Sequence, residues 1–281
     1  MDAGRAGRSY GFLMTQTGSP VEATSLAFEA RPHSSMKVPE ATPLFWVAKL
    51  TTTAFGEAFS DFVFFNDYIG QYRAILIGLA FLIACLIGQF ATKRYLPPVY
   101  WLSVTAVSIF GTMSADFLNK DLGMPLWASS SVLLSLQSAV FLTWYRTQKT
   151  LDVHSVNTVP RELFYWLTVI FTFALGTAAG DFASVTLGLG TLASALVFLV
   201  IICLPAAGYR WLGLNSVVAF WLAYTITRPL GASVADWLGV PAPYGDGLQL
   251  GTLAMSVVFG IALLVVVSAL SIRHRTTAIR A

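Results

Sequence analysis

Four aspartates recur at the same place in a repeated motif, and they are the residues of this chain best suited to chemistry. In each copy a Trp is followed ten residues later by a Gly and five residues after that by an Asp. The four aspartates are Asp61, Asp116, Asp181 and Asp236. Repulsion among several carboxylates that are removed from water favours the uptake of protons or a cation. The Asp column therefore predicts a ring of cation- or proton-binding groups.

Three further charged residues interrupt the apolar motif segments. Glu57 stands one helical turn before Asp61, Lys49 lies nearer the Trp, and Arg228 directly precedes Pro229. Charged groups inside a membrane are costly, so they are usually paired or functional. We expect Glu57 and Arg228 to form an ion pair where the first and last repeats meet, and Arg228 and Lys49 to be ion-pair or substrate groups. A purely structural role for the pair is the alternative.

The side chains available for a metal ion are mostly oxygen ligands. The tentative set is Glu57, Asp61, Asp116, Asp181 and Asp236. Oxygen ligands suit Mn²⁺, Mg²⁺ or Ca²⁺ better than copper or zinc, which favour Cys and His. The three histidines lie outside the predicted helices, and Cys85 and Cys203 lie alone within apolar runs. We predict no cofactor, although a divalent cation such as manganese could be transported.

Each Asp also has a simpler interpretation as a helix cap that accepts hydrogen bonds from backbone amides. The loop near Asp116 begins soon after it, as this interpretation requires. Asp181, in contrast, is followed by 28 residues without a charged side chain. The two interpretations make different predictions for Asp→Asn variants, because Asn caps a helix about as well as Asp but carries no charge.

The elements that must position these residues are membrane helices. Hydrophobic residues make up 56% of the chain and charged residues 11%, whereas soluble domains carry about 25% charged residues. Apolar runs recur that are long enough to cross about 30 Å of hydrocarbon. We predict an all-α polytopic membrane protein with eight transmembrane helices, at about 42–64, 74–92, 97–118, 126–145, 162–183, 186–208, 214–238 and 249–271.

The motif copies lie on alternate helices, so the chain reads as four tandem, parallel two-helix repeats. Their bounds are about 42–95, 97–149, 162–210 and 214–272. Small residues flank the motif glycines at four-residue spacing, which favours close helix packing. The first, third, fifth and seventh helices should therefore form the core, packed at Gly56, Gly111, Gly176 and Gly231. The longer connection in the middle suggests two four-helix halves.

The tryptophans and the basic residues predict how the helices sit in the membrane. We interpret Trp46, Trp101, Trp166 and Trp221 as an interfacial aromatic belt. Nine Lys or Arg residues follow the even-numbered helices, and two lie in the opposite loops. This bias predicts that both termini are cytoplasmic. By the helical rise, the aspartates then lie about 22 Å from the Trp level.

The N-terminal segment, residues 1–35, has no apolar core of the kind a secretory signal needs, and we expect a disordered cytoplasmic tail. Translation from Met36 is an open alternative, which leaves 36–281 as the membrane domain. The segments "KVPEATPLFWVAK" and "TTTAFGEAFSDF", with the later Trp–Gly–Asp copies, resemble a bacterial membrane-protein family described only as a tandem repeat of unknown function. The resemblance implies four two-helix repeats, each with a characteristic Trp, in the bacterial inner membrane.

Function has to be argued from the residues. The leading hypothesis is a secondary transporter or exporter of a cation, proton-coupled through the Asp ring. The alternatives are a transporter of a small organic solute and a non-transporting scaffold or assembly protein. We find no phosphate-binding loop, zinc pair or nucleophile–base pattern, so we do not expect an enzyme. The expected partners are the lipid bilayer and the transported cation, with no nucleic acid; a homo-oligomer stays open.

Overall fold

The computed structural model describes residues 36–66 and 70–280, and it is entirely helical over those residues. The predicted tail, 1–35, lies outside the described residues. Within the described part of the chain there are eight long α-helices, and they agree closely with the eight predicted ranges. They are α2 (Pro43–Asn66), α3 (Gln71–Ala91), α4 (Pro97–Asp116), α5 (Leu126–Gln148), α6 (Val159–Asp181), α7 (Gly190–Trp211), α8 (Ser216–Gly239) and α9 (Thr252–Arg280).

Short irregular turns join or extend these helices. The π-helical turns η2 (Phe117–Asp121) and η4 (Phe182–Thr186) continue α4 and α6, and a 3₁₀ turn, η3 (Val153–Ser155), lies between α5 and α6. Local sequence explains several helix starts. Proline stands in the first turn of α4 and of α6, where its missing N–H costs nothing. Asn215 caps α8, because its side chain accepts a hydrogen bond from the Val217 amide at 2.9 Å.

Seven helices, α3 to α9, are long and apolar enough to cross a membrane. This count covers the described residues only. The remaining helix, α2, carries Lys49, Glu57 and Asp61 and is not among the seven. The chain thus has the makeup of a membrane protein.

The four motif helices form a closed ring. Each of α2, α4, α6 and α8, which we call the inner helices, packs against two of the others in the order α2–α4–α6–α8 and back to α2. The ring is continuous, so the suggestion of two four-helix halves is wrong. Tight packing of the inner helices decides this, and the longer connection between repeats does not interrupt it.

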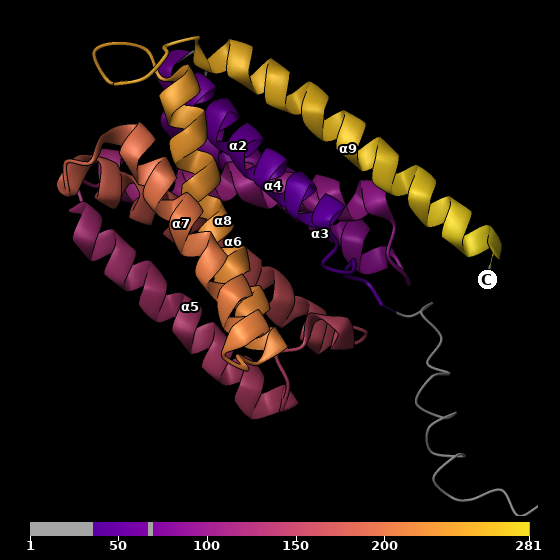
Figure 1. Ribbon diagram of the computed structural model, residues 1–281. Helices are drawn as coiled ribbons and strands as arrows, with labels where there is room; N and C mark the ends of the chain where they lie inside the picture. The colour runs from indigo at the N-terminus through magenta and orange to yellow at the C-terminus, as the bar shows by residue number, and fades with distance from the viewer. Residues whose placement is uncertain (1–35, 67–69, 281) are drawn as a thin grey trace, which may run out of the picture. The chain divides into compact units, whose positions relative to one another are not determined.

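The outer helices α3, α5, α7 and α9 lie outside this ring, as Figure 1 shows for α5 and α9. Each packs mainly on the inner helix of the next repeat, so that α3 lies on α4, α5 on α6 and α7 on α8. The last outer helix, α9, packs on α2 and completes the cycle. The repeats therefore interlock, since each one covers its neighbour.

The motif glycines make the close contacts of the ring. A Cβ added at each Gly would overlap a residue of the next inner helix around the ring. The four overlapped residues stand at equivalent positions of the four repeats. The pairs are Gly56 with Ser108, Gly111 with Phe173, Gly176 with Arg228, and Gly231 with Thr53. Glycine is needed at these positions because any side chain would separate the helices, in line with the packing expected from the sequence.

The four aspartates lie inside continuous helical backbone and do not begin helices. Asp61 and Asp236 lie within α2 and α8, and the chain continues as a π turn after Asp116 and Asp181. Among the described residues, no hydrogen bond joins one of these carboxylates to a backbone amide at a helix start. The cap interpretation is therefore wrong, and the carboxylates need another explanation.

Candidate functional site

The inner helices place equivalent residues of the four repeats in layers along the axis of the ring. The aromatic layer consists of the residues that precede each motif Trp: Phe45, Tyr100, Tyr165 and Phe220. The central layer consists of the residues that follow each motif Gly: Glu57, Thr112, Thr177 and Ala232. The acidic layer holds Asp61, Asp116, Asp181 and Asp236. Within each inner helix, the helical periodicity brings residues three or four apart to one face. The sequence repeat then supplies one equivalent residue from each inner helix to every layer.

The predicted ion pair between Glu57 and Arg228 is present in the central layer. Nη2 of Arg228 lies 2.7 Å from Oε2 of Glu57, and both side chains are buried. The same nitrogen donates to the hydroxyl groups of Thr177, at 2.8 Å, and Thr112. The hydroxyl of Thr112 also donates to the Glu57 carboxylate at 3.1 Å. Buried charges of this kind are tolerated only when they are paired and hydrogen-bonded.

Backbone carbonyls complete the coordination of Arg228. Its Nε donates to the carbonyl of Phe173 at 3.3 Å, and its Nη1 donates to the carbonyl of Thr53 at 3.2 Å. The guanidinium, carried by α8, thus bonds to α2, α4 and α6. One side chain therefore ties all four inner helices together across the axis.

Lys49 lies on the same axis but makes no ion pair with any described residue, so of the two roles expected for it only that of a substrate group stays open, as a prediction. It is fully buried, and its ammonium has no hydrogen-bond acceptor among the described residues. The Nζ atom lies 3.7 Å from the ring centre of Phe173 and 4.2 Å from that of Tyr224. Aromatic faces attract cations and are its main contacts here.

Three of the predicted cation ligands come together between the central and acidic layers. One carboxylate oxygen each from Glu57, Asp61 and Asp236 lie within 4.8 Å of one another, close enough to share a metal ion. One buried oxygen of Asp236, Oδ1, has no hydrogen-bond partner in the described part of the chain. Asp116 and Asp181 lie outside this group of three. The structure therefore gathers part of the tentative ligand set, from the first and last repeats.

Asp116 has a cation of its own, which the sequence reasoning missed. Nζ of Lys120, on η2, lies 2.9 Å from Oδ1 of Asp116. The signal was available, because residues four apart meet on a helix and Lys120 follows Asp116 by four. The predicted helix ends at 118, so the sequence does not lead us to expect Lys120 on the same helical face as Asp116.

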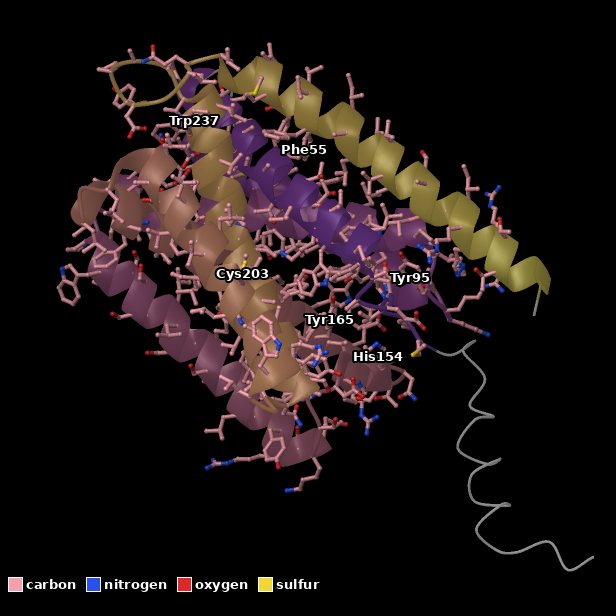
Figure 2. The ribbon with its side chains drawn as sticks, viewed as in Figure 1. Phe55, Tyr95, His154, Tyr165, Cys203 and Trp237 are labelled. Carbon is pink, nitrogen blue, oxygen red and sulfur yellow. The ribbon has the colours of Figure 1, made fainter. Side chains whose placement is uncertain are left out.

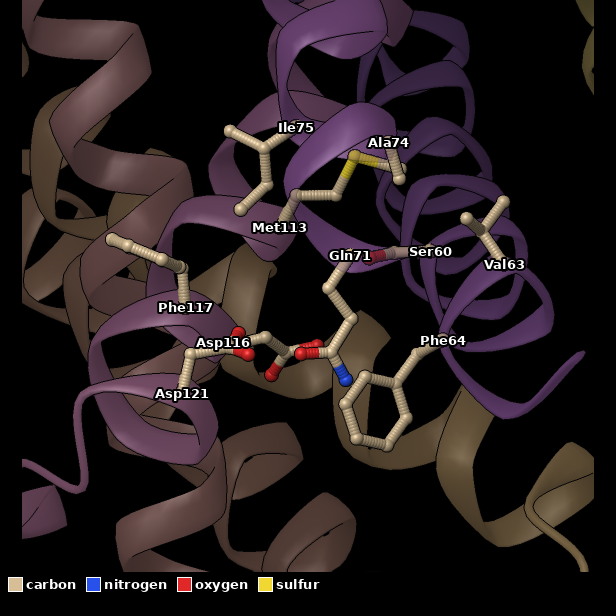
Figure 3. A pocket seen from close by; sticks show the side chains of 10 residues that line it. All are labelled: Ser60, Val63, Phe64, Gln71, Ala74, Ile75, Met113, Asp116, Phe117 and Asp121. Atoms are coloured by element: carbon tan, nitrogen blue, oxygen red, sulfur yellow. The ribbon is translucent and has the colours of Figure 1, made fainter. Parts of the chain in front are cut away.

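A pocket opens beside the acidic layer (Figure 3). It lies among α2, α3, α4 and η2, and two carboxylates line it, those of Asp116 and Asp121. Ser60, next to Asp61 in the chain, lines it as well. The acidic layer therefore borders a small pocket, lined by both polar and apolar side chains, at this end of the inner helices.

The opposite end of the ring is filled by aromatic side chains. Trp101, Trp166 and Trp221 are buried, and the hydroxyls of Tyr100 and Tyr165 are 2.5 Å apart. In Figure 2, Tyr165 lies toward this end and Trp237, next to Asp236, toward the other. An aromatic belt needs side chains that face the membrane interface. The belt interpretation is wrong for these three tryptophans, which pack inside the bundle; only Trp46 is partly exposed.

A comparison of the chain with known protein families identifies the same four repeats. The family described as Repeat of Unknown Function (DUF347) matches residues 44–95, 99–150, 164–213 and 219–276. The chain belongs to this family. Each DUF347 repeat comprises one inner and one outer helix, which confirms the predicted repeat architecture. Comparisons with curated proteins and with solved structures gave no significant match.

A polar latch joins the segment before the first DUF347 repeat to the end of that repeat and to the start of α6. Nζ of Lys37 lies 2.5 Å from Oε2 of Glu162, and Gln89 donates to the other oxygen of that carboxylate at 3.2 Å. The Tyr95 amide also bonds to the carbonyl of Met36 at 2.9 Å. No pattern in the sequence pointed to this latch, because its members come from three separate segments.

Proposed function

We propose that this protein is a secondary transporter or exporter of a cation, coupled to protons and with its substrate site at the acidic layer. The observation that carries the proposal is the convergence of Glu57, Asp61 and Asp236 inside a bundle of membrane-type helices. Ionisable groups in such surroundings are costly, and transport is the common reason for keeping them.

Charge balance supports the coupling to protons. The central and acidic layers hold five carboxyl groups, whereas the cations that contact them are Arg228 and Lys120. Burial makes an excess of negative charge unfavourable unless protons or a bound cation offset it. A cation that enters the group of three carboxylates would displace protons from them, and its release would allow them to return.

The two ends of the ring differ in a way that fits alternating access. A small pocket borders the acidic layer at one end, whereas at the other end aromatic side chains pack between the inner helices and a larger pocket lies beside Trp46 and Phe220. Transporters of this kind expose one central site to each side in turn.

For the substrate we propose a divalent metal ion, with manganese as the specific candidate. The group of three offers carboxylate oxygens only, and Ser60 and Thr112 nearby add hydroxyls. Such ligands favour Mn²⁺, Mg²⁺ or Ca²⁺.

We further propose that all eight helices cross the bacterial inner membrane with both termini cytoplasmic. In this arrangement α2 is a span whose charges are satisfied inside the ring. The bias of nine basic residues against two supports the orientation. In a variant without Cys85 and Cys203, a cysteine at Leu122 should react with an impermeant reagent from outside the cell, and a cysteine at Arg94 should react only after the membrane is opened. The reverse pattern would overturn the orientation.

The central test is cation binding by carboxylate variants. Purified protein should gain thermal stability on addition of Mn²⁺, because a ligand that binds the folded state raises its stability. Asp61→Asn and Asp236→Asn should abolish this gain, whereas Asp152→Asn, which changes an exposed carboxylate, should keep it. In vesicles, uptake of Mn²⁺ should respond to an imposed pH gradient. Folded Asn variants that bind and transport like the parent protein would refute the proposal.

A membrane scaffold is the second candidate, and the Arg228 network favours it. One guanidinium bonds to the three other inner helices across the axis, which is what a static core needs. The scaffold predicts no cation-dependent stabilisation and no pH-driven uptake, so the same experiments separate the two functions.

A further inference from the structure

Lys120 occupies a position in the acidic layer that no other repeat provides. Residues four positions after Asp61, Asp181 and Asp236 are Phe65, Val185 and Val240. Only the second repeat therefore places an ammonium group next to its aspartate. Its Nζ lies 2.9 Å from Oδ1 of Asp116 and 4.4 Å from the ring centre of Phe64.

The charge of Lys120 acts beyond Asp116. It interacts electrostatically with all four aspartates of the acidic layer. The flexible side chain of Lys120 thus reduces the mutual repulsion of the carboxylates from one side of the acidic layer. A cation that approaches through the pocket would meet this ammonium at Asp116, beside the group of three carboxylates.

The two partners of the ion pair differ in their freedom to move. The side chain of Lys120 is 36% exposed, whereas that of Asp116 is 7% exposed and lines the pocket. A lysine side chain has several rotatable bonds and can carry its charge into water. Asp116 is held within the ring. Separation of this pair would therefore move the lysine and leave the carboxylate available from the pocket.

We infer that Lys120 is a tethered counter-ion that competes with the transported cation and sets the selectivity of the acidic layer. This inference rests on the proposed function. With no substrate, the ammonium neutralises Asp116 and its neighbours. A divalent ion attracts Asp116 more strongly than a single ammonium does, so on its way to the group of three it displaces the lysine, whereas a monovalent ion competes poorly. Lys120 thus makes the site selective for divalent ions.

The competing explanation is that Lys120 only fixes η2 to α4. The two roles predict opposite effects of Lys120→Gln on binding. Loss of a competitor lowers the dissociation constant for Mn²⁺, on the order of tenfold for coupled sites, and it increases competition by Na⁺. Loss of a simple structural contact lowers the thermal stability of the substrate-free protein and leaves the dissociation constant unchanged or raised.

The experiment measures Mn²⁺ binding calorimetrically, with and without excess Na⁺, for the parent protein, Lys120→Gln and Lys120→Arg. Lys93→Gln is the matched control, because it removes the same charge from an exposed position outside the acidic layer. Tighter Mn²⁺ binding by Lys120→Gln alone supports the inference, as does binding that appears only in this variant. Equal binding by the parent protein, Lys120→Gln and Lys93→Gln overturns it. If no protein binds Mn²⁺, both the inference and the manganese proposal fail.

A second measurement uses the parent protein and does not depend on the folding of a variant. Saturating Mn²⁺ should expose the displaced ammonium and increase acylation of Lys120 by an amine reagent, measured by peptide mass spectrometry. Acylation of Lys93 should stay constant. If Mn²⁺ binds while Lys120 labelling stays constant, the proposed function stands and the tethered counter-ion is overturned.

Discussion

The carboxylate of Glu57 and the guanidinium of Arg228 meet at 2.7 Å in the centre of the helix ring, although 171 positions separate them in the chain. The contact joins the first repeat to the last. Glu57 is also one of the three carboxylates that we propose as the cation site. The same pair therefore closes the ring and borders the site.

Removal of either partner should destabilise the protein more than removal of both. Glu57→Gln or Arg228→Met leaves a buried charge unpaired, which costs about 3–5 kcal/mol. The double variant Glu57→Gln/Arg228→Met should recover part of that loss. Thermal unfolding in detergent measures the three variants, with Arg146→Met as a control at an exposed position. Strictly additive losses would show that the two charges do not interact.

Alanine should have opposite effects at two helical glycines. At Gly56 a Cβ would overlap the side chain of Ser108, and forced overpacking costs about 1–3 kcal/mol. At Gly88, on α3, no atom lies within 4 Å of the added Cβ. There the better helix propensity of Ala should stabilise the protein by up to about 1 kcal/mol. Melting temperatures of Gly56→Ala and Gly88→Ala provide the comparison, and equal shifts would contradict the packing assigned to Gly56.

The polar latch should contribute to stability through its charges. Glu162→Gln leaves the Lys37 ammonium without its carboxylate in a mostly buried position, so we expect a loss of about 3 kcal/mol or more. Asp152→Asn is the matched control, because it breaks an exposed contact with His154 and should change stability little. The free energy of unfolding of the two variants should therefore differ clearly. Similar values would mean that the latch is not formed in the membrane-extracted protein.

The contact between Asp246 and the start of α7 should make stability depend on acidity. Asp246, in the loop after α8, accepts two hydrogen bonds from Thr191. One comes from the hydroxyl group of Thr191 and the other, at 2.9 Å, from the backbone amide of Thr191. These bonds, led by that of the hydroxyl, lower the pKa of Asp246 below its usual value. Because the pKa of Asp246 is lower in the folded protein than in the unfolded chain, its ionised form stabilises the fold at pH values above the unfolded pKa of about 4. This stabilisation is lost as the pH falls through the pKa of the folded state.

Thr191→Ala tests this dependence. At neutral pH the variant should melt slightly below the parent protein, and the two curves should converge as the pH approaches 3. A difference that stays constant from pH 3 to 7 would exclude Asp246 as its source. Thr147→Ala, at an exposed hydroxyl on α5 far from any carboxylate contact, serves as the control.

The repeated Trp, Gly and Asp columns were enough to predict the architecture. A period of 55 or 65 residues over apolar segments requires four equivalent two-helix units, and small residues around each Gly identify the helices that must approach closely. The Glu57–Arg228 pair followed from the same alignment, because a charge that replaces small or apolar residues within a membrane helix needs an opposite charge at similar depth. Periodicity along the chain carries this information directly.

The tertiary structure alone decided which way side chains face and which distant segments meet. Trp101, Trp166 and Trp221 pack inward and are buried, although their spacing would be the same in an interfacial belt. The partners of Lys49, Asp116 and Glu162 depend on contacts between helices whose relative rotation no single segment specifies. The sequence thus determined the repeat and its charged columns. Packing in three dimensions determined which three carboxylates converge and that Lys120 lies beside Asp116.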